Sequence, residues 1–156
     1  MLRISKLTDY GTVILVYLAN DESGRLCSAS DVAAHTRLAL PTVQKVLKSL
    51  TNGGLVESAR GAEGGYRLAR AAKLISAAEI LDALEGPFAI TECSEDDSHC
   101  ELENDCQVGG AWQKISKAIR AAMDDITLSD LSNPPNEFPL RYTILSQSGH
   151  TAGLAK

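Results

Sequence analysis

The chain has 156 residues, of which 44% are hydrophobic and 4% aromatic, and its formal net charge is −5. This length allows one domain, or a small domain with an appendage. A run of about 18 apolar residues, which a membrane span would need, does not occur. The start, Met1–Lys6, lacks the apolar core of a signal peptide. We therefore predict a cytoplasmic protein without a membrane partner, whose thiols stay reduced.

The charge is divided unevenly along the chain. Residues 1–75 carry 10 Lys+Arg and 6 Asp+Glu, which gives +4, whereas residues 76–156 carry 5 and 14, which gives −9. The front half can therefore face a polyanion and the back half cannot. Chance clustering of charges on a solvated surface is the alternative interpretation.

Residues 5–20 have the spacing of an amphipathic helix. Ser5 or Thr8 can cap its start, and residues 20–24 end it. Asp9 lies in the first turns, where the helix dipole favours a carboxylate. The apolar face comprises Leu7, Tyr10, Val13, Ile14, Tyr17 and Leu18.

The next two helices form a helix-turn-helix pattern. A short helix over about 31–36 is capped by Ser28 or Ser30, and Pro41 opens a second helix that ends at Asn52. Its apolar stripe comprises Val43, Val46, Leu47 and Leu50. A short helix, a tight turn and a helix with a polar face are typical of DNA-binding proteins, although an ordinary helical hairpin shows the same pattern. The predicted DNA contacts here are Ser30, Thr42, Gln44, Lys45 and Lys48, with Ser49 on the same polar face.

A β-hairpin is predicted directly after these helices. Residues 55–59 and 66–69 are strand-like, and the glycine-rich segment 60–65 connects them. A hairpin in this position is the wing of a winged helix. Arg60, Gly61 and Arg67 are therefore predicted to approach the DNA backbone. The helix-turn-helix and the basic wing together favour DNA binding over an ordinary helical hairpin with a solvated face.

Two further helices follow. Residues 76–85 form a helix with the capping box Ser76 and Glu79, and Gly86-Pro87 ends it. Residues 111–125 form a longer helix that is too apolar on one side to stay bare, which predicts a homodimer. That side comprises Trp112, Ile115, Ile119, Ala122 and Met123, with Trp112 expected as a core anchor at the base of the dimer helix. From Ser132 onward the composition predicts a poorly ordered tail.

Three of the four cysteines lie between these two helices, at Cys93, Cys100 and Cys106. The stretch also carries six carboxylates and His99, and almost nothing apolar, so it cannot form a packed core. A metal or cluster held by the three thiolates would order it. Cys27 lies outside this set and is expected to be a small buried residue.

In this order of elements, the chain resembles the small dimeric winged-helix repressors that include IscR, NsrR and the regulators of SUF iron–sulfur cluster assembly. The resemblance covers residues 1 to about 131, and the segments that carry it are 4–10, 55–61, 64–68, 83–87 and the three cysteines. Segments 41–48, 85–87 and 91–93 look most like the SUF-regulator branch. The resemblance implies an iron–sulfur cluster on Cys93, Cys100 and Cys106 whose state controls DNA binding.

The resemblance leaves the fourth ligand of the cluster open. IscR-like members have a histidine three residues after the third cysteine, where this chain has Gly109. In NsrR-like members a carboxylate in the first helix of the other subunit completes a [4Fe-4S] cluster, and the matching residue is Asp9. This implies [4Fe-4S] rather than [2Fe-2S], with Asp9 of the partner subunit as ligand. His99, Glu92, another acid or an exogenous ligand are the alternatives.

The predicted fold class is mainly α with a small β wing, a winged helix-turn-helix domain plus a long dimerisation helix. We predict a DNA-binding domain over 1–86, a cysteine-bearing loop over 87–108, a dimerisation helix over 109–131 and a tail over 132–156. The predicted function is a repressor that binds a partly palindromic operator and senses iron–sulfur, redox or nitric oxide status to control SUF-type genes. The alternatives are a nitric-oxide-responsive repressor of NsrR type and structural zinc on the three cysteines and His99. The pattern gives no support for an enzyme.

Overall fold

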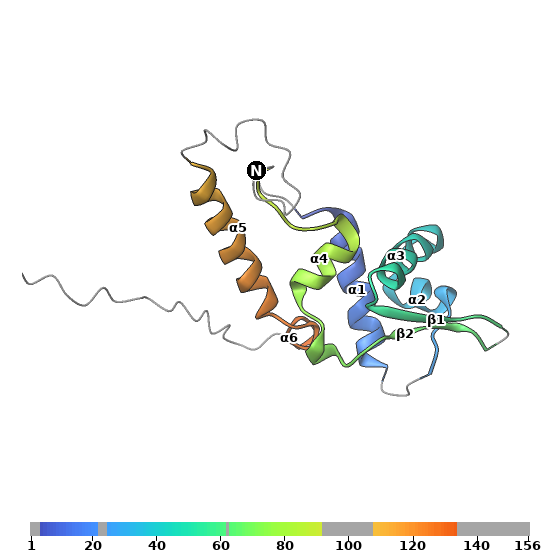
Figure 1. Cartoon of the computed structure of the whole chain (residues 1–156). Helices are drawn as coiled ribbons and strands as arrows, with labels where there is room; N and C mark the ends of the chain where they lie inside the picture. Colours follow the sequence, from blue (N-terminus) through green and yellow to red (C-terminus); the bar gives the residue numbers. More distant parts are fainter. Residues whose placement is uncertain (1–3, 22–24, 62, 92–107, 134–156) are drawn as a thin grey trace, which may run out of the picture.

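The computed structural model describes residues 4–21, 25–61, 63–91 and 108–133. These residues form a mainly helical body with one two-stranded antiparallel sheet, which confirms the predicted fold class (Figure 1). The elements in chain order are α1 (Lys6–Asn20), α2 (Ala29–Thr36), α3 (Leu40–Asn52), β1 (Val56–Ala59), β2 (Gly65–Leu68), η1 (Ala72–Leu74), α4 (Ala77–Glu85), α5 (Gly109–Asp124) and α6 (Leu128–Ser132).

Helix α1 is the central element of the core. The Ser5 side chain accepts a hydrogen bond from the Leu7 N–H and thereby caps the helix. Ile14, Leu15 and Leu18 are buried, and α1 packs against α2, α3, α4 and α6. The prediction for Val13 was wrong, because its side chain is 42% exposed and Leu15 takes the buried place. The buried face of α1 is centred between Ile14 and Leu15, and Val13 points away from that centre because successive residues on a helix lie about 100° apart.

Helix α3 buries the stripe that its sequence predicted. Val43, Val46, Leu47 and Leu50 all have an exposed fraction of zero, and they join Val32 of α2 in the core. The helix begins at Leu40, with Pro41 in its first turn, where a missing N–H leaves no hydrogen bond unmade. The burial of one face leaves the opposite face of α3 in solvent.

The wing is the hairpin of β1 and β2. Its register pairs Val56 with Leu68 and Glu57 with Arg67. Val56 is buried, while the next three residues of β1 are exposed, so the hairpin roots in the core and extends away from the body (Figure 1). The backbone of Cys27 exchanges hydrogen bonds with Tyr66, at 2.9 and 2.8 Å between N and O, which fixes the wing beside α2.

Helices α4 and α5 pack together on the side of α1 away from the wing (Figure 1). The capping box of Ser76 and Glu79 starts α4 as predicted. Helix α5 begins at Gly109, two residues before the predicted start. Its successor α6 packs against α1, and Leu128 at its start is fully buried in the core. The predicted division of the chain into domains remains a prediction.

Candidate nucleic-acid interface and sensor segment

The helix-turn-helix is formed by α2 and α3. The hydroxyl of Ser28 accepts the Asp31 N–H, and the Asp31 carboxylate accepts the Ser28 N–H, so Ser28 rather than Ser30 is the cap of α2. Ser30 is exposed in the first turn. Arg37 ends α2 in the left-handed conformation with φ 59°, which turns the chain sharply into α3. This conformation costs a non-glycine residue roughly 1–2 kcal/mol.

The exposed face of α3 carries the predicted DNA contacts. Gln44, Lys45 and Lys48 are exposed, and Thr42 is half-buried at the start of the helix. Within the described part of the chain, neither lysine pairs with a carboxylate. A helix with this combination of an amide and free ammonium groups can read base edges through Gln44 and neutralise phosphates through Lys45 and Lys48. The structure thus brings these predicted residues together on one surface.

The wing residues divide into two kinds. Arg60 and Gly61 are exposed at the turn, where Gly61 adopts a φ of +117°. Arg67 is engaged across the hairpin instead, since its Nε and Nη2 donate to Glu57 Oε2 at 3.1 and 2.9 Å. Both side chains are more than half exposed, so water weakens the pair, which is worth 0–1 kcal/mol at most sites of this kind. Sequence reasoning missed that Glu57 neutralises Arg67.

Cys27 is the buried residue that the sequence predicted, with 5% of its surface exposed. Its thiol donates to Asp21 Oδ2 at 3.1 Å. Burial raises the pKa of the thiol, and the hydrogen bond to the Asp21 carboxylate raises this pKa further, although Tyr17 partly opposes the effect. Because the thiolate is the reactive species, this environment suits a structural cysteine rather than a nucleophile.

Cys93, Cys100 and Cys106 lie outside the described residues, and so do Glu92 and His99. The structure does describe both approaches to this segment. On one side the Phe88 N–H donates to Asp82 of α4 at 3.2 Å, and the Ile90 N–H donates to Ser116 of α5 at 3.3 Å. On the other side the chain enters α5 at Gly109.

Asp9 is exposed near the start of α1, and within the described residues its carboxylate makes no hydrogen bond or ion pair. The neighbouring Thr8 hydroxyl donates to Glu85 of α4, and the Ser5 N–H donates to the same carboxylate oxygen at 3.1 Å. The Thr8 hydrogen bond is the main cause that lowers the pKa of Glu85. Sequence reasoning missed Glu85, because its partners lie 77 and 80 residues away.

Among the described residues, two large apolar side chains of α5 remain partly exposed. Trp112 is 40% exposed and Ile115 42% exposed, while Gly109 and Ser116 are the residues of α5 that are buried. Trp112 is only partly buried within this chain, so its role as an anchor of the dimer helix stays a prediction. No helix among the described residues is both long and apolar enough to span a membrane.

A helix-turn-helix with a polar face on its second helix and a hairpin beside it defines a winged helix-turn-helix protein. The Rrf2 family, whose description is iron-dependent transcriptional regulator, matches residues 4–134, and the chain belongs to this family. The predicted resemblance to IscR and NsrR is confirmed, because relatives with these names match the chain. The chain is accordingly a transcriptional regulator and not an enzyme.

The relatives span nearly the whole fold. The chain is 30% identical to the HTH-type transcriptional regulator NsrR of Bacillus licheniformis, over 83% of this chain and 92% of the relative. It is 32% identical to the HTH-type transcriptional regulator CymR of Bacillus subtilis, over 85% and 91%. The solved structure of CymR, the global cysteine regulator of B. subtilis, superposes with a TM-score of 0.64 and covers 85% of this chain and 97% of that one. T. potens IscR follows with a TM-score of 0.61, 29% identity and coverage of 83% and 85%.

Proposed function

We propose that this regulator binds a partly palindromic operator as a homodimer and represses SUF-type iron–sulfur cluster assembly genes in the cytoplasm, according to the state of a bound iron–sulfur cluster. The observation that carries the DNA part is the exposed face of α3. Gln44, Lys45 and Lys48 point away from a stripe that is fully buried. A recognition helix needs this arrangement, because its contacts must be solvent-accessible while its other face holds the orientation.

The partly exposed apolar side of α5 supports the proposed dimer. Trp112 and Ile115 are large apolar side chains that remain about 40% exposed on one helix face. A second copy of α5 offers the same apolar surface, and two-fold symmetry makes such a contact self-complementary. Two copies would also present two recognition helices, which matches a palindromic operator.

The described residues fit the proposed cluster where they can be compared with it. The Asp9 carboxylate is exposed and has no partner among the described residues, so it is free to coordinate a cluster held by the partner subunit. Cys93, Cys100 and Cys106, with Asp9 of the partner subunit, would hold a [4Fe-4S] cluster in preference to [2Fe-2S]. A carboxylate is a harder ligand than a thiolate, which would leave one iron labile. When bound, such a cluster would supply a centre that changes with oxygen, nitric oxide or iron supply.

Support for the SUF-type target comes from the residues that resemble that branch, in segments 41–48, 85–87 and 91–93. The description of the family as iron-dependent agrees with a regulator of iron metabolism. Structural zinc on the three cysteines and His99 is the competing site. Metal and acid-labile sulfide analysis separates the two, since zinc without sulfide would overturn the cluster proposal.

The DNA part is tested by operator binding of Gln44→Ala and Lys48→Ala. Gln44→Ala should cost about 1–3 kcal/mol on the operator and little on random DNA if Gln44 reads a base edge. Lys48→Ala should weaken both and reduce the salt dependence by about one phosphate contact. Lys73→Ala removes an exposed lysine on η1 and serves as the matched control. Unchanged operator affinity in both α3 variants would contradict the proposed recognition surface.

A further inference from the structure

The last turn of α4 contacts a different part of the molecule with each of its four residues. We call Asp82–Glu85 the α4 junction. Residues on a helix point about 100° apart, so four in succession cover a full turn of directions. A turn placed between several elements can therefore hold all of them at once.

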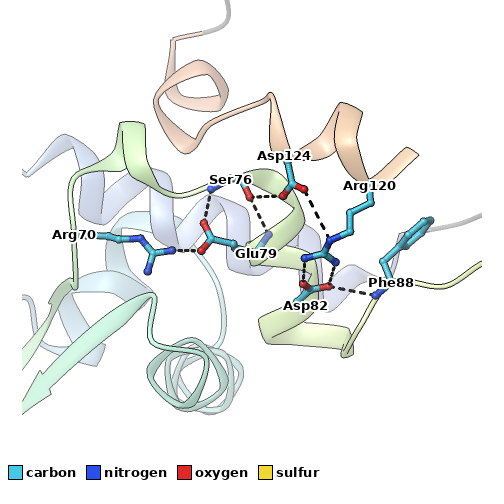
Figure 2. A network of polar contacts seen from close by, with 7 residues as sticks. All are labelled: Arg70, Ser76, Glu79, Asp82, Phe88, Arg120 and Asp124. Atoms are coloured by element: carbon cyan, nitrogen blue, oxygen red, sulfur yellow. Dashed lines mark hydrogen bonds and ion pairs between the residues drawn. The ribbon is translucent and has the colours of Figure 1, made fainter. Parts of the chain in front are cut away.

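Asp82 holds α5 and the chain that leads to the cysteines (Figure 2). Its two carboxylate oxygens accept Arg120 Nη1 at 3.0 Å and Nη2 at 2.6 Å. Oδ1 also accepts the Phe88 N–H at 3.2 Å. The forked arginine contact has a defined orientation, because both oxygens are engaged in parallel. A displacement of the segment after Phe88 therefore acts directly on α4 and α5.

The next two residues pack α4 tightly on the end of α3 and on α1. A Cβ added to Gly53, which caps the end of α3, would lie 2.5 Å from the Cβ of Ala83. A Cβ added to Gly11 of α1 would likewise collide with the side chain of Leu84. At Gly53 only glycine allows this close approach, because Ala83 has no longer side chain that could move aside, whereas at Gly11 the tip of Leu84 would have to shift. Interiors packed this closely transmit a displacement rather than absorb it.

Glu85 completes the junction at the start of α1. Its Oε1 accepts the Ser5 N–H at 3.1 Å and the hydroxyl hydrogen of Thr8, a residue with 7% of its surface exposed. These bonds satisfy one of the free N–H groups at the helix start and fix the turn that carries Asp9. The junction thus reaches both proposed parts of the sensor, the segment after Phe88 and the turn of Asp9.

We infer that the α4 junction couples the cysteine segment to the DNA-binding helices, with Asp82 and Glu85 as positioning residues for the change in DNA affinity. This inference rests on the proposed cluster-dependent function. A shift of the cysteine segment would reach Asp82 through the Phe88 N–H, and a shift of α5 would reach it through Arg120. Ala83, Leu84 and Glu85 pass it to the end of α3 and to the start of α1.

The test compares operator affinity of cluster-loaded and cluster-free full-length protein for the wild type and Asp82→Asn. Coupling between two sites typically changes affinity about 5- to 150-fold, and we expect Asp82→Asn to reduce this ratio to about twofold or less. The matched control is Asp124→Asn, because Asp124 also lies near Arg120, with 3.9 Å between Oδ2 and Nε, but makes no contact with Phe88 (Figure 2). Asp124→Asn should keep the wild-type ratio.

A second variant keeps the test valid if Asp82→Asn fails to fold. Arg120→Lys keeps the charge and removes the forked geometry, and it should lower the ratio in the same direction. Visible absorbance and sedimentation verify that cluster and dimer persist. A full wild-type ratio in both Asp82→Asn and Arg120→Lys would overturn the inference, as would an equal loss in Asp124→Asn.

Amide hydrogen exchange of the cluster-free protein keeps this test separate from the proposed function. In Asp82→Asn a single side-chain oxygen remains for both Arg120 and the Phe88 amide, so the hold on both weakens. We expect faster exchange at Phe88 and also at Ser5, at Leu7 and at Gly53, which lie in other elements. Faster exchange confined to Phe88 and α5 would overturn the junction, whatever the wild type does with its cluster. If the wild type shows equal affinity in both states, cluster sensing fails while this exchange pattern still decides on the junction.

Discussion

Helices α3 and α5 have similar amphipathic patterns but differ in how far their apolar sides are buried. The stripe of α3 is fully buried against α1, α2 and α4, whereas Trp112 and Ile115 of α5 remain about 40% exposed. An apolar stripe specifies that a helix needs a partner, but not whether the partner belongs to the same chain. The stripe of α3 thus finds its partners within the chain, whereas the partly exposed side of α5 is left for the proposed second copy.

The largest expected effect is on the buried stripe. Leu50→Ala should lower the free energy of unfolding by about 2–5 kcal/mol, because Leu50 is fully buried and its loss leaves a cavity. Urea denaturation measures it at several protein concentrations. The matched variant Ile115→Ala should lower stability only through the dimer, so that its deficit disappears on dilution. A concentration-independent deficit of the same size in Ile115→Ala would remove the distinction between the helices.

A smaller effect is expected on association itself. Ile115→Glu places a charge on the bare face of α5, and it should weaken the dimer by about 2 kcal/mol or more if Ile115 is a central contact. Sedimentation at a series of concentrations measures the dissociation constant. Ala121→Glu introduces the same side chain at another exposed position of α5 and should leave the dimer unchanged. Equal dissociation constants for both variants would place the interface elsewhere.

The wing allows a smaller effect to be measured on the proposed DNA-binding surface. Glu57→Gln releases Arg67 from its carboxylate partner, so Arg67 becomes available to a phosphate. The slope of log affinity against log salt should steepen by about 0.9 if it gains one phosphate contact. Glu63→Gln removes a charge from the exposed wing turn without changing Arg67, and it should leave that slope unaltered. An identical response of the two variants would show a general charge effect only.

The smallest effect is the acid dependence of the contact between α1 and α4. The hydrogen bond from Thr8 lowers the pKa of Glu85 below its ordinary value of 4.5. A lowered folded pKa contributes stability that is present above pH 4.5 and lost as the pH falls through the folded value. The stability difference between wild type and Glu85→Gln should therefore shrink below pH 4.5. A difference that is constant across acid pH would show that the carboxylate charge does not matter here.

The sequence predicted the elements because their signals are local. The capping box of Ser76 and Glu79, Pro41 at the start of α3 and the buried stripe of Val43, Val46, Leu47 and Leu50 all depend on neighbours within a few residues. These signals identify a helix or a cap without any tertiary information. The winged helix-turn-helix could be derived from them before the structure was known.

The contacts between elements could not be predicted in this way. Arg120 and Asp82 are 38 residues apart, and Glu85 reaches Thr8 across 77 residues. A salt bridge or hydrogen bond over such a separation leaves no periodicity in the sequence. The same holds for Arg67, whose partner Glu57 is determined by the register of the hairpin. The ligand set of the cysteines stays a prediction, since Cys93, Cys100 and Cys106 lie outside the described residues.

The most direct test of the central claim is anaerobic native mass spectrometry of the wild type beside Asp9→Ala. The account predicts a wild-type dimer that carries one [4Fe-4S] cluster for each subunit. Asp9→Ala should keep the dimer and lose the cluster or convert it, because its carboxylate completes the site of the partner subunit. Thr91→Ala, a polar change two residues before Cys93 and outside the proposed ligand set, is the control and should match the wild type. A wild-type dimer that holds zinc, or no metal after anaerobic reconstitution, would contradict the account.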